Sequence, residues 1–254
     1  MIRLQLVVPC YNEAARLNSR AFLQLVGSNR DIGLLFVDDG STDATRAVLA
    51  DIAAQGGGQI STLMLPHNVG KAGAVQRGIL AAFQTDPELV GYWDADLSTP
   101  LEAVQEFIDV LDANPQMEIV MGARVKLLGR RINRYASRHY FGRAFATAAS
   151  LALDLPVYDT QCGAKIFRAS PSIRQAFSVP FRSRWIFDVE ILARYIATTG
   201  RAAAGSRIYE LPLRAWTYVP GSKVTARDAL RAFWDLAIIW RRQTSDGSRR
   251  AGSM

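Results

Sequence analysis

The sequence predicts an α/β fold in which helices cover both faces of a mostly parallel sheet. Short apolar runs of strand length alternate with longer segments whose apolar residues recur at helical spacing. This alternation is typical of parallel sheets, because parallel neighbours need a long crossover connection, usually a helix. The strands expected in the first half are 4–8, 34–37, 62–65, 89–93 and 119–121, and the helices are 13–28, 42–54, 70–84 and 100–113.

The pattern becomes less regular after residue 124. Residues 124–143 hold seven Lys and Arg and no acidic residue. No linker rich in Ser, Gly or Pro divides the chain, so we expect one domain over residues 1–224. The elements expected in this half are a helix over 131–153, a strand over 165–168, a helix over 187–199, a strand over 208–216, an amphipathic helix over 225–242 and a disordered tail over 243–254.

Charge and cysteine content limit the partners and the compartment. The chain carries a formal net charge of +7, which favours anionic partners such as nucleotides, phospholipid headgroups or nucleic acid. No recognised nucleic-acid-binding module is visible, so nucleic acid is the weakest of the three. Cys10 and Cys162 are far apart and form no CxxC, which argues against disulfide and metal frameworks and fits a reducing cytoplasm.

The apolar runs are too short for membrane insertion. The first run, which ends before Pro9, is shorter than the apolar region of a signal peptide and is predicted to be a strand. No uninterrupted apolar stretch approaches the roughly 20 residues that span a bilayer. Any membrane contact is therefore expected to be peripheral, or to be supplied by a membrane-protein partner.

Two aspartates stand one residue apart where an expected strand ends. Asp94 and Asp96 follow the apolar run LVGYW, so both carboxylates can reach one hard cation. Mg²⁺ prefers one or two protein carboxylates together with phosphate oxygens, and it neutralises a departing diphosphate. The same pattern also fits an ordinary polar loop in which an aspartate caps a helix.

Two further polar clusters follow expected strands. The cluster DDGSTD begins at Asp38, and its carboxylates can hydrogen-bond a base and a ribose, while Ser41 or Thr42 can cap the next helix. The cluster NVGKAG contains Lys71 and opens a helix, so backbone N–H groups and one positive charge can approach a phosphate. Neither a Walker loop nor a GxGxxG follows the strands, which disfavours an NTPase and a dinucleotide-binding oxidoreductase.

Taken together, the motifs resemble a known family. VVPCYNEAARL, FVDDGSTDAT, NVGKAGAVQRGI and YWDADLSTP, in this order, are similar to family 2 glycosyltransferases of the GT-A fold. In the second half, DTQCGAKIF, RWIFDVE and PGSKV resemble the dolichyl-phosphate glucosyltransferase branch more than the related dolichyl-phosphate mannose synthases. The resemblance extends from residue 4 to about residue 240.

The resemblance implies a set of site residues. It predicts an inverting, metal-dependent transfer of glucose from UDP-glucose to a polyprenyl phosphate, with Mg²⁺ or Mn²⁺ as the cofactor. It also implies a place at the cytoplasmic face of a membrane. The implied nucleotide contacts are Pro9, Tyr11, Glu13, Asp38 and Lys71; the metal ligands are Asp94 and Asp96 with Ser98 as a third oxygen; Arg124, Arg138 and Lys223 meet phosphate; and Asp188 is assigned to the catalytic site.

Two departures from the family affect the membrane prediction. The eukaryotic glucosyltransferases carry an N-terminal membrane helix, and some relatives have C-terminal spans; neither is present here. The expected helix over 225–242 places Leu230, Phe233, Trp234 and Ile238 on one side, with arginines flanking it. Such a helix suits a membrane interface, although its apolar face can equally pack on the domain.

Other functions stay open at this stage. A family 2 enzyme that uses GDP-mannose or UDP-GlcNAc, or a saccharide hydroxyl acceptor, shares most of these motifs. A hydroxyl acceptor needs a carboxylate base, for which Asp159, Asp188 and Glu190 are the candidates. A silent nucleotide-sugar binding protein is a third hypothesis, against which Asp94 and Asp96 argue. The basic stretch at 124–143 can also be a solvated surface.

Overall fold

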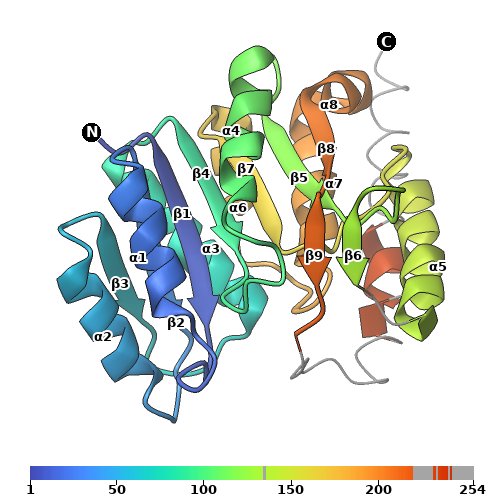
Figure 1. Ribbon diagram of the computed structural model, residues 1–254. Coiled ribbons are helices and arrows are strands. Elements are labelled where there is room, and N and C mark those ends of the chain that lie inside the picture. Colours follow the sequence, from blue (N-terminus) through green and yellow to red (C-terminus); the bar gives the residue numbers. More distant parts are fainter. Residues whose placement is uncertain (134–135, 220–230, 233, 240, 242–254) are drawn as a thin grey trace.

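A seven-stranded sheet forms the centre of the computed structural model, and helices lie on both of its faces (Figure 1). The strand order is β3-β2-β1-β4-β7-β5-β8, and β6 and β9 form a separate two-stranded sheet. This arrangement confirms the predicted mostly parallel α/β architecture. The structure describes residues 1–133, 136–219, 231–232, 234–239 and 241, with the side chains of 136–141 left aside.

The elements follow the chain in the order expected of β-α-β units. The strands are β1 (Leu4–Cys10), β2 (Ile32–Asp38), β3 (Ile60–Met64), β4 (Leu89–Trp93), β5 (Ile119–Ala123), β6 (Arg131–Asn133), β7 (Ala164–Arg168), β8 (Ile208–Pro212) and β9 (Ala215–Thr217). The helices are α1 (Ser19–Ser28), α2 (Thr45–Gln55), α3 (Lys71–Ala82), the 3₁₀ turn η1 (Phe83–Thr85), α4 (Ala103–Ala113), α5 (Ala136–Leu153), α6 (Pro171–Phe177), α7 (Phe187–Thr199) and α8 (Arg201–Arg207).

Alternation along the central strands divides the core between the two faces of the sheet. Leu6 and Val8 of β1 pack with α1, α2 and α4, whereas Val7 points to the side of α3, α6 and α7. Because side chains alternate along a strand, each central strand contributes to both cores, and this explains its continuous apolar sequence. The sheet is therefore buried on both faces, and its strand ends stay free to carry polar groups.

One antiparallel strand interrupts the parallel order. β7 pairs antiparallel with both β4 and β5, so β4 and β5 run in the same direction although they are not neighbours. β1 pairs parallel with β2 and with β4. The carboxyl ends of β1, β2, β4 and β5 thus lie at one edge of the sheet.

The predicted helix starts over 13–28 and 42–54 were too early. α1 begins at Ser19, because the Asn18 side chain accepts a hydrogen bond from the Ala21 N–H and caps the helix. α2 begins at Thr45, and Asp43 accepts from the Thr45 N–H at 2.9 Å. Neither Ser41 nor Thr42 caps this helix, contrary to the prediction; the carboxylate of Asp43 is the group that reaches its first turn.

Two elements predicted between residues 124 and 216 were also wrong in detail. The helix expected over 131–153 begins at Ala136, because Arg131–Asn133 forms β6, whose first N–H donates to the Arg214 carbonyl. The strand expected over 208–216 is two strands in two sheets. Pro212 has no N–H to donate, so it ends β8, and the chain turns to pair with β6.

Two short helices escaped the sequence prediction. α6 begins at a serine cap followed by proline at the first helical position, a start signal that was visible in the sequence. α8 is only a few residues long and follows Gly200, which has a φ of +82°. Both helices pack through buried residues into the core on the α3 side.

The described part of the C-terminal helix packs on the domain. Ala232 and Leu236 are buried in the core shared with α3 and α7, and Ile239 lies against it, whereas Trp234 is exposed. Packing on the domain, one of the two alternatives, therefore holds for this part. Residues 220–230, 233, 240 and 242–254, which include most of the predicted helix start and the predicted tail, lie outside the described residues. Within the described part of the chain, no helix has the length and apolarity needed to cross a bilayer.

This packing predicts opposite effects of two substitutions in one helix. Leu236→Ala should lower the free energy of unfolding by about 2–5 kcal/mol, because it removes buried methyl groups and leaves a cavity. Trp234→Ala, the control, should change it by no more than about 0.5 kcal/mol, because that side chain is exposed. Equilibrium unfolding in urea measures both. Equal effects of the two changes would contradict the packing.

Candidate functional site

Three polar loops meet at the carboxyl ends of β1, β2 and β4. β2 lies on one side of β1 and β4 on the other, so the loops after β1 and β4 diverge at this boundary. A boundary of this kind is a topological switch point, where ligands bind in open α/β sheets. The loop after β4 carries Asp94 and Asp96, and the loop after β2 begins at Asp39.

Asp39 ties the β2 loop to the start of α3. Its carboxylate accepts hydrogen bonds from the backbone N–H groups of Val69 at 2.7 Å and Gly70 at 2.9 Å. Burial raises the pKa of Asp39, and these two hydrogen bonds oppose that shift. Gly40, with a φ of +67°, passes so close to the backbone of Asn68 that a Cβ atom would lie 2.6 Å from its nitrogen. The position of Lys71, the first residue of α3, follows from this attachment.

Asp38, the predicted partner of the nucleotide base, is fully buried. Its Oδ2 accepts from Arg46 Nε at 2.7 Å, and its Oδ1 accepts from the Ser41 N–H at 3.2 Å. Arg46 also donates to the Leu65 carbonyl at the end of β3. Asp38 therefore holds the β2 loop and α2 together in this structure.

The other predicted nucleotide contacts lie in the loop after β1. Pro9 and Tyr11 are half-buried at the end of the strand. Glu13 is buried, and its carboxylate pairs with the guanidinium of Arg16. Asp96 and Asp94 act electrostatically on Arg16, which places this arginine near the aspartate pair. The sequence gave Arg16 no role, because its neighbour in space is more than one loop away.

Asp94 and Asp96 lie with Lys71 at the switch point. The Lys71 ammonium is 2.5 Å from Asp94 Oδ1, and the Asp94 side chain is 30% exposed. Asp96 Oδ1 accepts from the N–H of Ser98, which is buried. Burial acts to lower the pKa of Lys71, but Asp94 and then Asp188 outweigh it, so the net shift is upward. Lys71 is thus a fixed cation among carboxylates.

Gly163 allows the Asp94 carboxylate to occupy its position. The Asp94 N–H donates to the Gly163 carbonyl at 2.9 Å, which extends the pairing of β4 with β7 by one residue. A Cβ atom on Gly163 would lie 1.9 Å from Asp94 Oδ2. Any side chain at this position would therefore displace the carboxylate. The sequence resemblance included this glycine but did not reveal the contact.

A buried ion pair lies beneath this glycine. Lys165 Nζ is 2.5 Å from Asp188 Oδ1 and also donates to the carbonyls of Thr160 and Cys162, at 2.9 and 2.6 Å. The Tyr92 hydroxyl donates to the same oxygen of Asp188. Burial first, and then Asp188, raise the pKa of Tyr92 well above its usual value, so it remains a donor. Asp188, predicted to be catalytic, is therefore buried and paired in this structure.

Arg124 is held by a carboxylate from another segment. Its Nε and Nη2 donate to Asp159 at 2.6 and 2.7 Å, and its guanidinium carbon lies 5.3 Å from the ring centre of Trp216. Burial opposes the charge on Arg124, but Asp159 outweighs it and raises the pKa of Arg124. Arg138 lies in α5 with its side chain not described, and Lys223 lies outside the described residues.

Four more polar side chains near these loops were missed at the sequence level. Arg184 donates to Asn68 Oδ1 at 3.3 Å and lies directly over Gly70. Three buried atoms have no hydrogen-bond partner in the described part of the chain: Arg143 Nη1, Thr160 Oγ1 and Gln161 Nε2. Thr160 and Gln161 stand just before Gly163, and Arg143 stacks on Tyr158 in the same segment, with 3.8 Å from the guanidinium carbon to the ring centre.

The carboxylates at the switch point suit a cation that shares its coordination with a ligand. Across the residues that the structure describes, no group of three or more His, Cys, Asp or Glu could enclose a metal. Asp94 and Asp96 are two carboxylates on one loop, and Asp96 Oδ2 has no protein donor among the described residues. This donor set fits Mg²⁺ or Mn²⁺, which bind through one or two carboxylates and complete their shell with phosphate and water.

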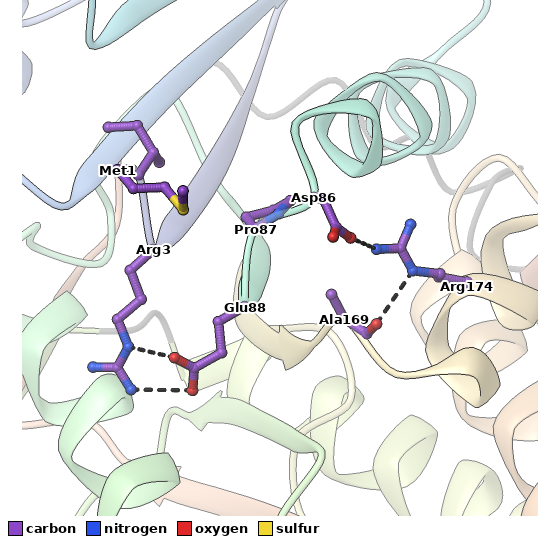
Figure 2. A pocket seen from close by; sticks show the side chains of 8 residues that line it. Met1, Arg3, Asp86, Pro87, Glu88, Ala169 and Arg174 are labelled. Carbon is purple, nitrogen blue, oxygen red and sulfur yellow. Dashed lines mark hydrogen bonds and ion pairs between the residues drawn. The ribbon is translucent and has the colours of Figure 1, made fainter.

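A cavity of about 430 Å³ lies at the opposite edge of the sheet (Figure 2). It is lined by Arg3, Asp86, Glu88 and Arg174, among others. Figure 2 shows these charges paired with one another: Arg3 with Glu88, and Arg174 with Asp86. Because its charges are already neutralised and it is remote from Asp94, this cavity is not the candidate site.

Comparison with known proteins assigns the family. Residues 5–174 match the family described as glycosyl transferase family 2. The chain belongs to this family. A dolichyl-phosphate β-glucosyltransferase of Trichomonas vaginalis is 31% identical over 245 residues, covering 92% of this chain and 69% of the relative. A protein of the same name from Dictyostelium discoideum is 32% identical over 264 residues, covering 94% and 77%.

Solved structures of another glycosyltransferase share the fold. Glucosyl-3-phosphoglycerate synthase of Mycobacterium tuberculosis in complex with UDP has a TM-score of 0.65 at 18% identity, over 95% of this chain and 80% of that one. Its complex with Mn²⁺ and UDP-glucose has a TM-score of 0.62 at 19% identity, over 99% and 79%. At such low identity the likeness concerns the fold alone, and it confirms the predicted GT-A arrangement.

The contact between Gly163 and Asp94 predicts a large loss of activity from one methyl group. Gly163→Ala should lower sugar transfer by roughly a hundredfold or more, because a shift of about 1 Å in a catalytic group costs that much. Gly27→Ala, on the exposed side of α1 with no atom within 4 Å of its Cβ, is the control and should leave the rate unchanged. Steady-state rates with unchanged circular dichroism measure the effect. Wild-type activity of Gly163→Ala would refute the role of this contact.

Proposed function

We propose that this family 2 glycosyltransferase transfers glucose from UDP-glucose to a polyprenyl phosphate, with inversion at the anomeric carbon. The relatives named above as dolichyl-phosphate β-glucosyltransferases match almost the whole chain, which supports both the sugar and the class of acceptor. The product is a polyprenyl phosphate that carries one glucose. A single displacement by the acceptor phosphate accounts for the inversion.

The pairing of the candidate bases carries the proposal. Asp159, Asp188 and Glu190 were the carboxylates able to activate a hydroxyl acceptor, and each is buried against a cation. The pairs are Arg124–Asp159 at 2.6 Å, Lys165–Asp188 at 2.5 Å and Arg194–Glu190 at 2.7 Å. A neighbouring cation stabilises the charged form of a carboxylate and so weakens it as a base. A phosphate monoester needs no base, because it is largely dianionic at neutral pH and already nucleophilic.

The donor belongs at the switch point between β1 and β4. We place the uracil beside Pro9 and Tyr11, with Asp38 as its predicted polar partner. The diphosphate then lies toward Asp94, Asp96 and Lys71. A divalent cation held by Asp94 and Asp96, with Ser98 as a third oxygen, would neutralise the charge that develops on the leaving UDP. Lys71 stands beside the same carboxylate and can donate to the diphosphate.

The acceptor phosphate belongs on the side of Arg124. Two nitrogens of Arg124 are engaged by Asp159, and Nη1 has no partner among the described side chains, so it can donate to a phosphate oxygen. Asp159 fixes the plane of the guanidinium, which pre-orients that donor. Arg138 and Lys223 remain predicted phosphate contacts. Asp188 acts indirectly in this proposal, since it holds Lys165 and the loop that precedes Gly163.

The acceptor also implies a place in the cell. A polyprenyl phosphate is anchored in a bilayer, so the enzyme acts as a peripheral protein at a membrane surface. UDP-glucose is a cytoplasmic metabolite in this proposal, which puts the enzyme at the cytoplasmic face, with a membrane-protein partner as a further means of attachment.

A donor and acceptor screen tests the function. Purified protein is incubated with a short polyprenyl phosphate, Mg²⁺ or Mn²⁺, and either UDP-glucose, UDP-GlcNAc or GDP-mannose. We expect lipid-linked glucose from UDP-glucose and little product from the other donors. Faster transfer from GDP-mannose or UDP-GlcNAc would replace the donor. Transfer to oligosaccharide but not to lipid phosphate would replace the acceptor, and no hydrolysis or transfer with any donor would leave a silent binding protein.

The aspartate pair predicts dependence on a divalent cation. Asp96→Ala should abolish transfer and weaken the metal-dependent binding of UDP-glucose, since no other described carboxylate pair stands at this strand end. Removal of metal with EDTA should have the same effect on the wild type, and added Mn²⁺ should restore it. Calorimetry and a transfer assay give the two readouts. Near-normal turnover in EDTA would exclude this role of the pair.

The acceptor site predicts a kinetic effect that separates the two substrates. Arg124→Ala and Arg138→Ala should lower transfer to lipid phosphate by roughly ten- to a hundredfold, as expected for the loss of one charge-assisted hydrogen bond. UDP affinity should change far less. Arg124→Lys should restore only part of the rate, because an ammonium group cannot make two parallel bonds to phosphate.

Arg201→Ala provides the control for these variants. Arg201 is an exposed arginine of α8 that pairs with Asp154, so its loss should leave both substrates unaffected. Steady-state kinetics, with each substrate varied in turn, give the comparison. Unchanged acceptor kinetics for Arg124→Ala and Arg138→Ala would show that the stretch is a solvated surface.

A further inference from the structure

An ordered turn follows β5 and projects two leucines from the protein. Residues 125–131, here called the basic turn, have the sequence VKLLGRR. The Arg130 N–H donates to the Leu127 carbonyl at 3.1 Å, which closes a tight turn with Leu128 and Gly129 at its tip. Gly129 has a φ of +82°, the left-handed conformation that the third position of a type II turn requires. The turn is therefore a defined structure.

The tip of this turn is apolar and unburied. Leu127 is 49% exposed and Leu128 is 104% exposed. Turns usually carry Gly, Pro, Asn, Asp or Ser, each of which helps the backbone to turn or binds water. Single exposed leucines are common on protein surfaces, but two adjacent ones at a turn tip need a partner for their apolar surface.

The charges around the tip specify the chemistry of that partner. Lys126, Arg130 and Arg131 flank the leucines, and within the described chain none of their side chains forms an ion pair. Elsewhere, exposed arginines such as Arg3 and Arg174 are paired with carboxylates. No acidic residue occurs between residues 119 and 153. The turn thus combines a small apolar tip with an uncompensated positive collar, which suits a layer of anionic headgroups above hydrocarbon.

The position of the turn relates it to the site. β5 runs parallel to β4, because both pair antiparallel with β7, so the basic turn leaves the same edge of the sheet as Asp94. Figure 1 shows β5 leading through this connection to β6, next to β9. Arg124 is four residues before Leu128, and four extended residues span at most about 14 Å. A leucine tip placed below the headgroups would therefore put Arg124 near the level of a lipid phosphate.

We propose that the basic turn is a membrane-binding element. Leu127 and Leu128 insert into the outer part of the hydrocarbon of an anionic bilayer, and Lys126, Arg130 and Arg131 bind its headgroups. This inference deepens the proposed function and rests on it, because an acceptor anchored in the bilayer must be met at the surface. A protein partner fits less well, since a stable protein interface buries about 800 Å² on each side and the tip offers two side chains.

Vesicle binding without donor or acceptor tests the element alone. Full-length protein is sedimented with vesicles of phosphatidylcholine, either pure or with about a third phosphatidylglycerol. The wild type should bind the anionic vesicles and lose binding as salt rises. The double variant Leu127→Ser/Leu128→Ser should lower the partition coefficient by roughly tenfold or more, since it withdraws two apolar side chains from the bilayer.

A matched control separates this turn from exposed apolar residues in general. Leu151 and Val179 are 73% and 54% exposed and lie elsewhere on the surface, so Leu151→Ser/Val179→Ser should bind like the wild type. Equal binding of the Leu127→Ser/Leu128→Ser variant and the wild type would overturn the proposal. So would a change of oligomeric state in ultracentrifugation without a change in vesicle binding, which would indicate contact with a second copy.

A labelled variant gives an independent readout should the serine variant fold poorly. Both native cysteines are buried, so a thiol introduced by Leu128→Cys can be labelled selectively with a polarity-sensitive dye. Anionic vesicles should shift its emission to the blue, and a label introduced by Leu151→Cys should not respond. An unshifted label at position 128 would refute insertion.

Transfer assays distinguish this inference from the proposed function. The Leu127→Ser/Leu128→Ser variant should keep its rate with a short, water-dispersible polyprenyl phosphate and lose roughly tenfold with acceptor embedded in anionic vesicles. A wild type that binds vesicles through the turn but transfers sugar to neither acceptor would refute the proposed function and leave the membrane element standing. A wild type that transfers sugar but ignores anionic vesicles would do the reverse.

Discussion

The position of the site depends on a single buried ammonium group. Lys165 is 1% exposed, and a charge removed from water is stable only when it is paired and hydrogen-bonded. Asp188 and the carbonyls of Thr160 and Cys162 meet this need, so α7, β7 and the loop before Gly163 must converge on one point. That convergence places the Gly163 carbonyl where it receives the Asp94 N–H. The catalytic edge is thus fixed from below by an interaction that touches no substrate in the proposed mechanism.

The sequence predicted the class of fold and the edge of the sheet at which polar groups gather. It could do so because apolar runs and strand-end aspartates are local patterns. It did not predict that β7 lies antiparallel between β4 and β5, since pairing order is decided by contacts between distant segments. The same limit applies to charge: the stretch around Arg124 contains no acid, yet Asp159 arrives from another part of the chain to pair with it. Composition near a residue does not tell which charges surround it in space.

The distribution of paired and unpaired charges gives the site its chemical character. Carboxylates that could act as bases are neutralised by arginine or lysine inside the protein, while Asp94 and Asp96 remain at an open loop. Arg124 is rigid because Asp159 and Trp216 hold it, whereas Lys126 and Arg131 stand free of such pairing in the described structure. A fold that encloses its bases and presents its cations is suited to align two phosphate-bearing molecules, because repulsion between them is the main obstacle to their approach.

The antiparallel insertion of β7 also bears on synthesis of the chain on the ribosome. Strands β1 to β4 can pair as soon as they emerge, but the free side of β4 stays open until residues 164–168 have been made. During that interval β4 offers unpaired backbone groups with the apolar sequence LVGYW, a hazard for association with other nascent chains. Closure of that edge and completion of the aspartate loop are one event, since the same strand does both. A chain released before this point would lack activity and expose a sticky edge, so quality control and catalysis depend on the same late step.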